Sequence, residues 1–129
     1  MKRTILYAAA VCVALPAFLS SSVAQQPTIT RTAISTADFP PGYETVVAIG
    51  QVPAGVCFDR HTHFGMENVY LLEGELIVKI DGRPDQHLKP GQASQIPAGV
   101  PHSGCSIGAV KTLAVFVVEK GKPLATPAP

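Results

Sequence analysis

Residues 55–74 read GVCFDRHTHFGMENVYLLEG and place three potential metal ligands, His61, His63 and Glu67, between two glycines. Successive side chains of a β-strand point to opposite faces, so a strand through this segment puts both histidines on one face. If the chain turns at residues 64–66 and resumes as a strand, the carboxylate of Glu67 returns beside the two imidazoles. The segment therefore predicts a chelating pair with a third ligand next to it.

A fourth candidate ligand lies downstream, in the segment GQASQIPAGVPHSGCS at residues 91–106. Residues 97–99 (Pro-Ala-Gly) are a turn signal, and His102 opens the next apolar run. We therefore predict that four side chains surround one metal ion. They are His61, His63, Glu67 and His102.

The spacing of these two segments resembles the paired motifs of the cupin superfamily. The first segment reads GxxxxxHxHxxxExxxxxxG from Gly55 to Gly74, and the second reads GxxxxxPxGxxH from Gly91 to His102. One position departs from the pattern, because the family usually has asparagine four residues after the last histidine and this chain has Ser106. The resemblance implies a metal-binding β-barrel. The serine implies that the hydrogen bond of that asparagine is weakened or replaced by a shorter hydroxyl.

Short apolar and β-branched runs, separated by turns rich in Gly and Pro, continue through the chain after residue 24. We expect strands at residues 28–34, 43–52, 56–63, 67–72, 75–80, 86–89, 93–97, 102–107 and 110–118, the first of them an edge strand. In the run ELIVKI at residues 75–80, Leu76, Val78 and Ile80 share one face. No stretch after residue 24 shows a helical period. The pattern predicts an all-β barrel or jelly roll, and the resemblance implies the cupin form of it, a double-stranded β-helix. No internal repeat is visible, so we expect a single barrel.

The first 24 residues have the composition of a secretory signal peptide. Lys2 and Arg3 precede an apolar run from Ile5 to Leu19, and small residues follow up to Ala24. The run is shorter than the roughly 20 residues that a membrane span needs, and Pro16 interrupts it. We expect cleavage after Ala24, a periplasmic or secreted location and no stable membrane anchoring. The rest divides into an N-terminal strand and loop at 25–42, a cupin barrel at 43–119 and an extended, partly ordered tail at 120–129.

The charge balance limits the possible partners. Ten Lys and Arg residues stand against nine Asp and Glu residues, and no basic cluster occurs outside the leader. Nucleic acid is therefore not an expected partner. A small molecule is the expected ligand or substrate. The modest length of the barrel favours a homodimer. The cupin resemblance implies exchange of an N-terminal strand between copies, for which residues 28–34 are the candidate.

Two cysteines remain after the leader, Cys57 and Cys105. In an oxidising compartment such a pair can form a disulfide. However, Cys57 has the strand parity of the histidine pair and is expected to face inward, and the sequence does not fix its distance from Cys105. We favour two buried free thiols, with the disulfide as the alternative.

Five further side chains lie near the candidate metal ligands in the sequence or are of a type that could contribute to the site. Asp59 shares the strand parity of the histidine pair, so it either orients a ligand or is a solvated charge, whereas Arg60 is expected at the surface. His87 is expected to be a surface histidine. Tyr43 and Tyr70 are expected as packing residues with a hydroxyl at the rim, with donation from the pocket wall as the alternative.

Three imidazoles and one carboxylate suit first-row divalent ions better than calcium or magnesium. Manganese or iron is our first expectation, and zinc, nickel and copper are also compatible with these donors. The cupin resemblance implies a metal-dependent enzyme for a small oxygen-rich or enolic substrate, of the dioxygenase, oxidase or decarboxylase kind, with Glu67 also able to accept a proton. The alternative is a non-catalytic cupin that binds or senses a small ligand or metal.

Overall fold

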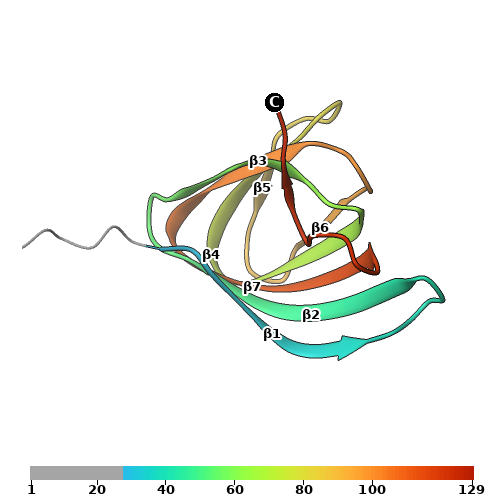
Figure 1. Ribbon diagram of the computed structural model, residues 1–129. Helices are drawn as coiled ribbons and strands as arrows, with labels where there is room; N and C mark the ends of the chain where they lie inside the picture. Colours follow the sequence, from blue (N-terminus) through green and yellow to red (C-terminus); the bar gives the residue numbers. More distant parts are fainter. Residues whose placement is uncertain (1–27) are drawn as a thin grey trace, which may run out of the picture.

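Two long strands, β4 (Gly65–Ile80) and β7 (His102–Glu119), form the centre of the sheet in the computed structural model, which describes residues 28–129. The shorter strands are β1 (Thr30–Ala37), β2 (Tyr43–Val52), β3 (Cys57–Thr62), β5 (Gln86–Leu88), β6 (Ala93–Ile96) and β8 (Thr126–Pro127). All strand pairs are antiparallel: β7 lies between β2 and β3 and also pairs with β4, which carries β5 and β6. Figure 1 shows the sheet folded over on itself, with β1 and β2 along one side and β3 on the other. The predicted all-β fold is confirmed.

The expected signal peptide at residues 1–24, with its cleavage after Ala24, lies outside the described residues. Among residues 28–129, no helical segment has the length and apolar character of a membrane span.

Each long strand merges two runs that the sequence predicts as separate strands. Residues 67–72 and 75–80 both lie in β4, and residues 102–107 and 110–118 both lie in β7. Gly74 has a φ of +81° where the pairing of β4 with β7 shifts register, so a bulge takes up the irregularity and the strand continues. The buried positions of β4 change there from odd numbers, ending at Leu71, to even numbers, beginning at Leu76.

The inward side chains of β4 and β7 build two apolar clusters. One contains Leu71 and the predicted core face of Leu76, Val78 and Ile80. The other is centred on Phe116, which has no exposed surface. Burying a side chain of this kind stabilises the fold by roughly 1.5–3 kcal/mol. These clusters fix the relative positions of the strands that carry the histidines.

Strand β1 is an edge strand, as the sequence predicts. It pairs only with β2, and all eight of its residues are exposed. Its register places Arg31 opposite Gly50 of β2, and Gly50 in turn lies opposite Thr112 of β7. This row of three positions leads from the edge of the sheet to its centre.

The C-terminal tail follows β3 instead of extending away from the barrel. Thr126 and Pro127 pair with β3 as β8, and the amide of Ala128 donates to the carbonyl of Arg60 over 3.0 Å. Strand β3 has an edge with free backbone groups, and the tail supplies partners for them. The expectation of a partly ordered tail missed this pairing.

The expected free thiols are wrong, because Cys57 and Cys105 form a disulfide. The two residues lie directly opposite each other in the pairing of β3 with β7. The register of β3 shifts between Phe58 and His61, so the strict two-residue period that placed Cys57 on the inner face with His61 does not hold. Cys57 is exposed.

Candidate metal centre

Three histidines converge in the barrel from the two strands that carry the sequence motifs. His61 belongs to β3 and lies opposite His102, the first residue of β7, while His63 follows the end of β3. One ring nitrogen from each residue lies within 4.8 Å of the other two. His63 and His102 are each only 2% exposed, and His61 is half-buried. The structure thus brings together all three histidines that the spacing singles out.

Main-chain carbonyl oxygens hold all three rings through Nδ1. The partners are the carbonyls of Asp59 for His61 (2.8 Å), Leu124 for His63 (2.5 Å) and Val100 for His102 (3.1 Å). A carbonyl oxygen can only accept, so each Nδ1 carries the proton. In a neutral ring the lone pair is then on Nε2, which is the tautomer that a metal-binding histidine needs.

Glu67, near the start of β4, lies beside two of the three histidines, His63 and His102. It is 7% exposed, and its Oε2 lies 2.9 Å from Nε2 of His63 and 3.4 Å from Nε2 of His102. Burial by itself would raise the pKa of Glu67, but hydrogen bonds that the carboxylate accepts from His102 and His63 in the absence of an ion outweigh it and lower the pKa to about 2. A bound ion would take the place of the protons that these two rings donate. Glu67 is therefore a carboxylate at neutral pH.

These distances fit a shared ion. Two ligand atoms about 2.1 Å from one ion are about 3.0 Å apart at a right angle and about 3.4 Å apart at a tetrahedral angle. The contacts of Glu67 with His63 and His102 have these lengths. In addition, apart from its 3.4 Å contact with Glu67, the buried Nε2 of His102 has no hydrogen-bond partner among residues 28–129, and coordination to an ion would engage its lone pair.

The electrostatic surroundings of His61 also favour metal binding. Burial lowers the pKa of His61 most, and the nearby His102 and His63 lower it further, against the opposing effects of the Asp59 carbonyl and of Glu67. A lowered pKa keeps this ring neutral at physiological pH. Since metal binding requires deprotonated ligands, fewer protons compete for the site.

A small cavity of about 70 Å³ opens beside the histidines. His61, Glu67 and His102 line one part of it, and most of the remaining wall is apolar, with Val69 and Ile96 among its residues. The volume is far below the roughly 300–1,000 Å³ of pockets that hold drug-sized ligands. The site therefore suits a ligand of a few non-hydrogen atoms.

Of the two alternatives for Asp59, the solvated charge is correct for its carboxylate, and it is the main-chain carbonyl that orients His61. The register shift in β3 leaves both Asp59 and Arg60 exposed, so the carboxylate of Asp59 lies outside the site while its carbonyl holds His61. Arg60 is at the surface as predicted, paired with Asp81. The carbonyl of Leu124 was missed altogether, because a backbone group carries no signal in the sequence.

Ser106 replaces the family's usual asparagine in a structural role. Its hydroxyl donates to the carbonyl of Pro53 over 2.6 Å and accepts from the amide of Val56 over 3.1 Å. Ser106 is buried, and these bonds tie β7 to the turn that precedes β3. The shorter hydroxyl therefore still connects the two motif strands.

The remaining candidates lie away from the cavity. Tyr43 and Tyr70 are 37% and 43% exposed and are absent from its lining, so donation from the pocket wall is wrong for both. His87 is exposed as predicted, and its Nε2 lies 2.6 Å from Oε2 of Glu75. It offers a natural control for the buried histidines.

Comparison with known proteins identifies the barrel. Residues 48–122, more than half of the chain, match the Cupin domain family. The chain belongs to the cupin family. A search of curated proteins gave no significant match to this cupin.

Several solved structures are similar to this cupin. A cupin superfamily protein from Desulfitobacterium hafniense DCB-2 has a TM-score of 0.63 at 19% identity, over 74% of this chain and 83% of its own. The DMSP lyase DddQ from Ruegeria pomeroyi DSS-3 has a TM-score of 0.60 at 22% identity, over 65% of this chain and 43% of its own. KdgF from Halomonas sp. has a TM-score of 0.53 at 18% identity, over 67% and 89%. At these identities the likeness establishes the fold.

Proposed function

We propose that this cupin is a divalent-metal-dependent enzyme that acts on a small oxygen-rich or enolic substrate, with dioxygenase, oxidase or decarboxylase-like chemistry. The observation that carries the proposal is the orientation of the three histidines. Each Nδ1 is held by a carbonyl, and one ring nitrogen from each of the three histidines lies within 4.8 Å of the other two. His61 and His102 also line the small cavity beside this group. Strands β3 and β7 and the C-terminal tail all contribute to this arrangement. Histidines that only filled space in the core would not need their Nδ1 atoms fixed in this way.

His61, His63, His102 and Glu67 would hold the ion. Bound there, a first-row divalent ion such as manganese or iron would supply Lewis acidity, or electron transfer to dioxygen. The lowered pKa of Glu67, about 2, makes it a weak base at neutral pH. Its position therefore supports the role of a metal ligand over that of a general base.

Similarity to the DMSP lyase supports an enzyme without naming its substrate. That lyase shares the barrel, but this chain spans only 43% of its length. The alternative function is a cupin that binds or senses a small ligand without turnover. The limited cavity of about 70 Å³ is compatible with it.

The test is metal content and affinity across single alanine variants of His61, His63, Glu67 and His102. We expect each variant to weaken metal affinity by at least about tenfold, because a loss of that size follows even when only a hydrogen-bond partner of a metal ligand is removed. Circular dichroism should still show a β fold. His87→Ala should retain wild-type metal content, because this residue is at the surface. If His61→Ala and His102→Ala keep their metal, the assigned site is wrong.

A second measurement separates the two functions. Wild-type protein with its metal is assayed for dioxygen uptake and for product formation with small carboxylic and enolic compounds. Turnover that disappears in the ligand variants supports the enzyme. Tight binding of a compound without any product supports the sensor.

We also propose that this cupin is exported and that it acts as a homodimer. The disulfide between Cys57 and Cys105 supports export, since disulfides persist in oxidising compartments. The exposed edge strand β1 supports contact with a second copy. Mass spectrometry of the exported protein should show a mature start near Gln25, and an intact Met1 would contradict the export proposal.

A further inference from the structure

We propose that Arg31 binds the carboxylate of the ligand, so that the substrate is a small organic acid held between this guanidinium and the metal centre. This inference rests on the proposed function and deepens it by assigning the charge of the substrate. Arg31 lines the same cavity as His61 and His102. It comes from β1, outside the two motif segments.

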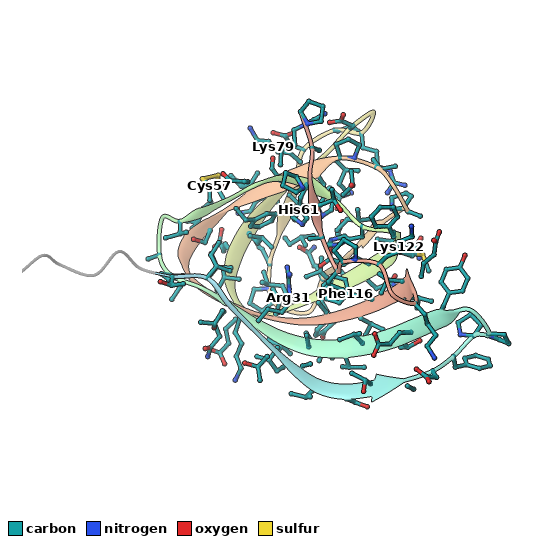
Figure 2. All side chains as sticks on the ribbon, in the orientation of Figure 1. Arg31, Cys57, His61, Lys79, Phe116 and Lys122 are labelled. Atoms are coloured by element: carbon teal, nitrogen blue, oxygen red, sulfur yellow. A yellow bond between two sulfur atoms is a disulfide. The ribbon has the colours of Figure 1, made fainter. Side chains whose placement is uncertain are left out.

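Although Arg31 belongs to the exposed edge strand, its guanidinium reaches the inner side of the sheet. Its Cζ lies 5.2 Å from the centre of the Phe116 ring, a cation–π contact with a residue that is fully buried. Figure 2 shows Arg31 and Phe116 near each other on the inner side of the sheet, with His61 across the interior. The aromatic contact orients the guanidinium and leaves its N–H donors available.

Those donors have no acceptor within the part of the chain that the structure describes, residues 28–129. Within residues 28–129 the three arginines are Arg31, Arg60 and Arg83. Arg60 pairs with Asp81, and Arg83 donates to the carbonyl of Gln95 over 2.9 Å. Arg31 is the one among these three that forms neither an ion pair nor a hydrogen bond. A guanidinium carries five donors in a planar fork, which matches a carboxylate in a bidentate pair.

Small residues leave room for a ligand next to Arg31. Gly50 lies directly opposite Arg31, and a Cβ at Gly50 would come within 2.5 Å of Oγ1 of Thr112. Ala114 follows on the same inner face of β7. The absence of larger side chains at these positions keeps the cavity open between the guanidinium and the histidines.

The charge of the cavity selects an anion. Glu67 is the only acidic residue in its lining, and the histidines and the proposed ion neutralise that carboxylate. Arg31 then leaves the cavity positive. With walls that are otherwise largely apolar and a volume of about 70 Å³, the cavity suits a short organic acid.

The test compares dicarboxylates with amides of the same shape. Malonate, succinate and glutarate offer one carboxylate to the metal and one to Arg31, whereas malonamate, succinamate and glutaramate lack the second charge. Binding of each pair to manganese-loaded protein is measured by calorimetry, with metal content recorded for every sample. The variants are Arg31→Gln, Arg31→Lys and the control Arg83→Gln, which alters an arginine outside the cavity.

For the best-fitting pair, we expect wild-type protein to prefer the diacid over its amide by about tenfold or more, the effect of one charge-assisted pair. Arg31→Gln should remove that preference by weakening diacid binding alone. Arg31→Lys should retain part of it, and Arg83→Gln should retain all of it.

The outcomes separate this inference from the metal site. If metal-loaded wild type shows no preference for any diacid, or if Arg31→Gln keeps the preference, the role of Arg31 is overturned and the metal site stands. If the protein takes up no metal but still prefers the diacid through Arg31, the proposed function fails and the anion site survives.

Discussion

Removing the C-terminal tail should weaken metal binding although the tail contains no metal ligand. We consider a truncation that deletes residues 123–129. It removes the carbonyl of Leu124, which accepts the Nδ1 proton of His63. The side chain of His63 is 0% exposed with the tail in place, and after truncation only water could replace the fixed carbonyl as acceptor.

The size of the effect follows from that burial. Leaving a buried donor without an acceptor costs about 1–3 kcal/mol, which corresponds to a factor of about 5–150 in an equilibrium constant. Loss of the acceptor also frees His63 to adopt the other tautomer or another orientation. We therefore expect metal affinity to fall by about 10–100-fold, in line with other partners of metal-bound histidines.

The measurement is metal affinity by competition with a chelator of known strength, with circular dichroism to confirm that the barrel is folded. The matched control deletes only residues 128–129. This control keeps Leu124 and β8 and loses the contacts of Ala128 and Pro129 with Arg60. It should bind metal within about twofold of wild type, since the acceptor of His63 is retained. Unchanged affinity in a folded 123–129 deletion would refute the role of the tail.

Three further predictions concern stability and assembly. Replacing Cys57 and Cys105 by serine should lower the free energy of unfolding by about 2–4 kcal/mol in denaturant titrations, because the bridge closes a loop across 48 residues. In chelator-treated protein, the pKa of Glu67 drops from 4.5 to about 2 on folding, so the unfolded chain binds more protons between these values and acidification destabilises the fold. Up to roughly 3 kcal/mol should be lost as the pH falls from 4.5 to 2, and urea titrations of Glu67→Gln should show a flatter dependence. Deleting residues 28–34 should raise the monomer fraction in sedimentation if β1 joins two copies, and an unchanged distribution would count against that dimer.

The pairing of His61 with His63 could be predicted because its information is local, whereas His102 followed from the spacing of the second motif. Two histidines separated by one residue share a strand face whether or not the strand is regular farther upstream. The run ELIVKI likewise identified its core face correctly, since Leu76, Val78 and Ile80 lie beyond the bulge and keep an unbroken period of two. In both cases the prediction spans only a few residues, over which parity is reliable.

The predictions failed where a β-bulge or register shift lay between the two residues whose side-chain directions were compared. The parity argument that carried Cys57 and Asp59 to the face of His61 crosses the register shift in β3, and it failed for both. The bulge near Gly74 had the opposite consequence, because a glycine that was interpreted as a break lies inside one continuous strand. Bulges depend on the pairing with a distant strand, here β7, and that pairing is not encoded in the segment itself.

Contacts made by the two ends of the barrel were also beyond sequence reasoning, and they suggest how the site divides its tasks. The motif strands supply the metal donors, His61, His63 and His102, whose positions follow from spacing. By contrast, the carbonyl of Leu124 arrives from the tail, and Arg31 arrives from the edge strand. Neither segment belongs to a motif, so each can change without displacing the histidines. Metal binding in this cupin would then depend on the motifs and the tail, while the choice of ligand would depend on β1. If β1 is exchanged in a dimer, each cavity would receive its arginine from the other copy, and ligand binding would depend on assembly.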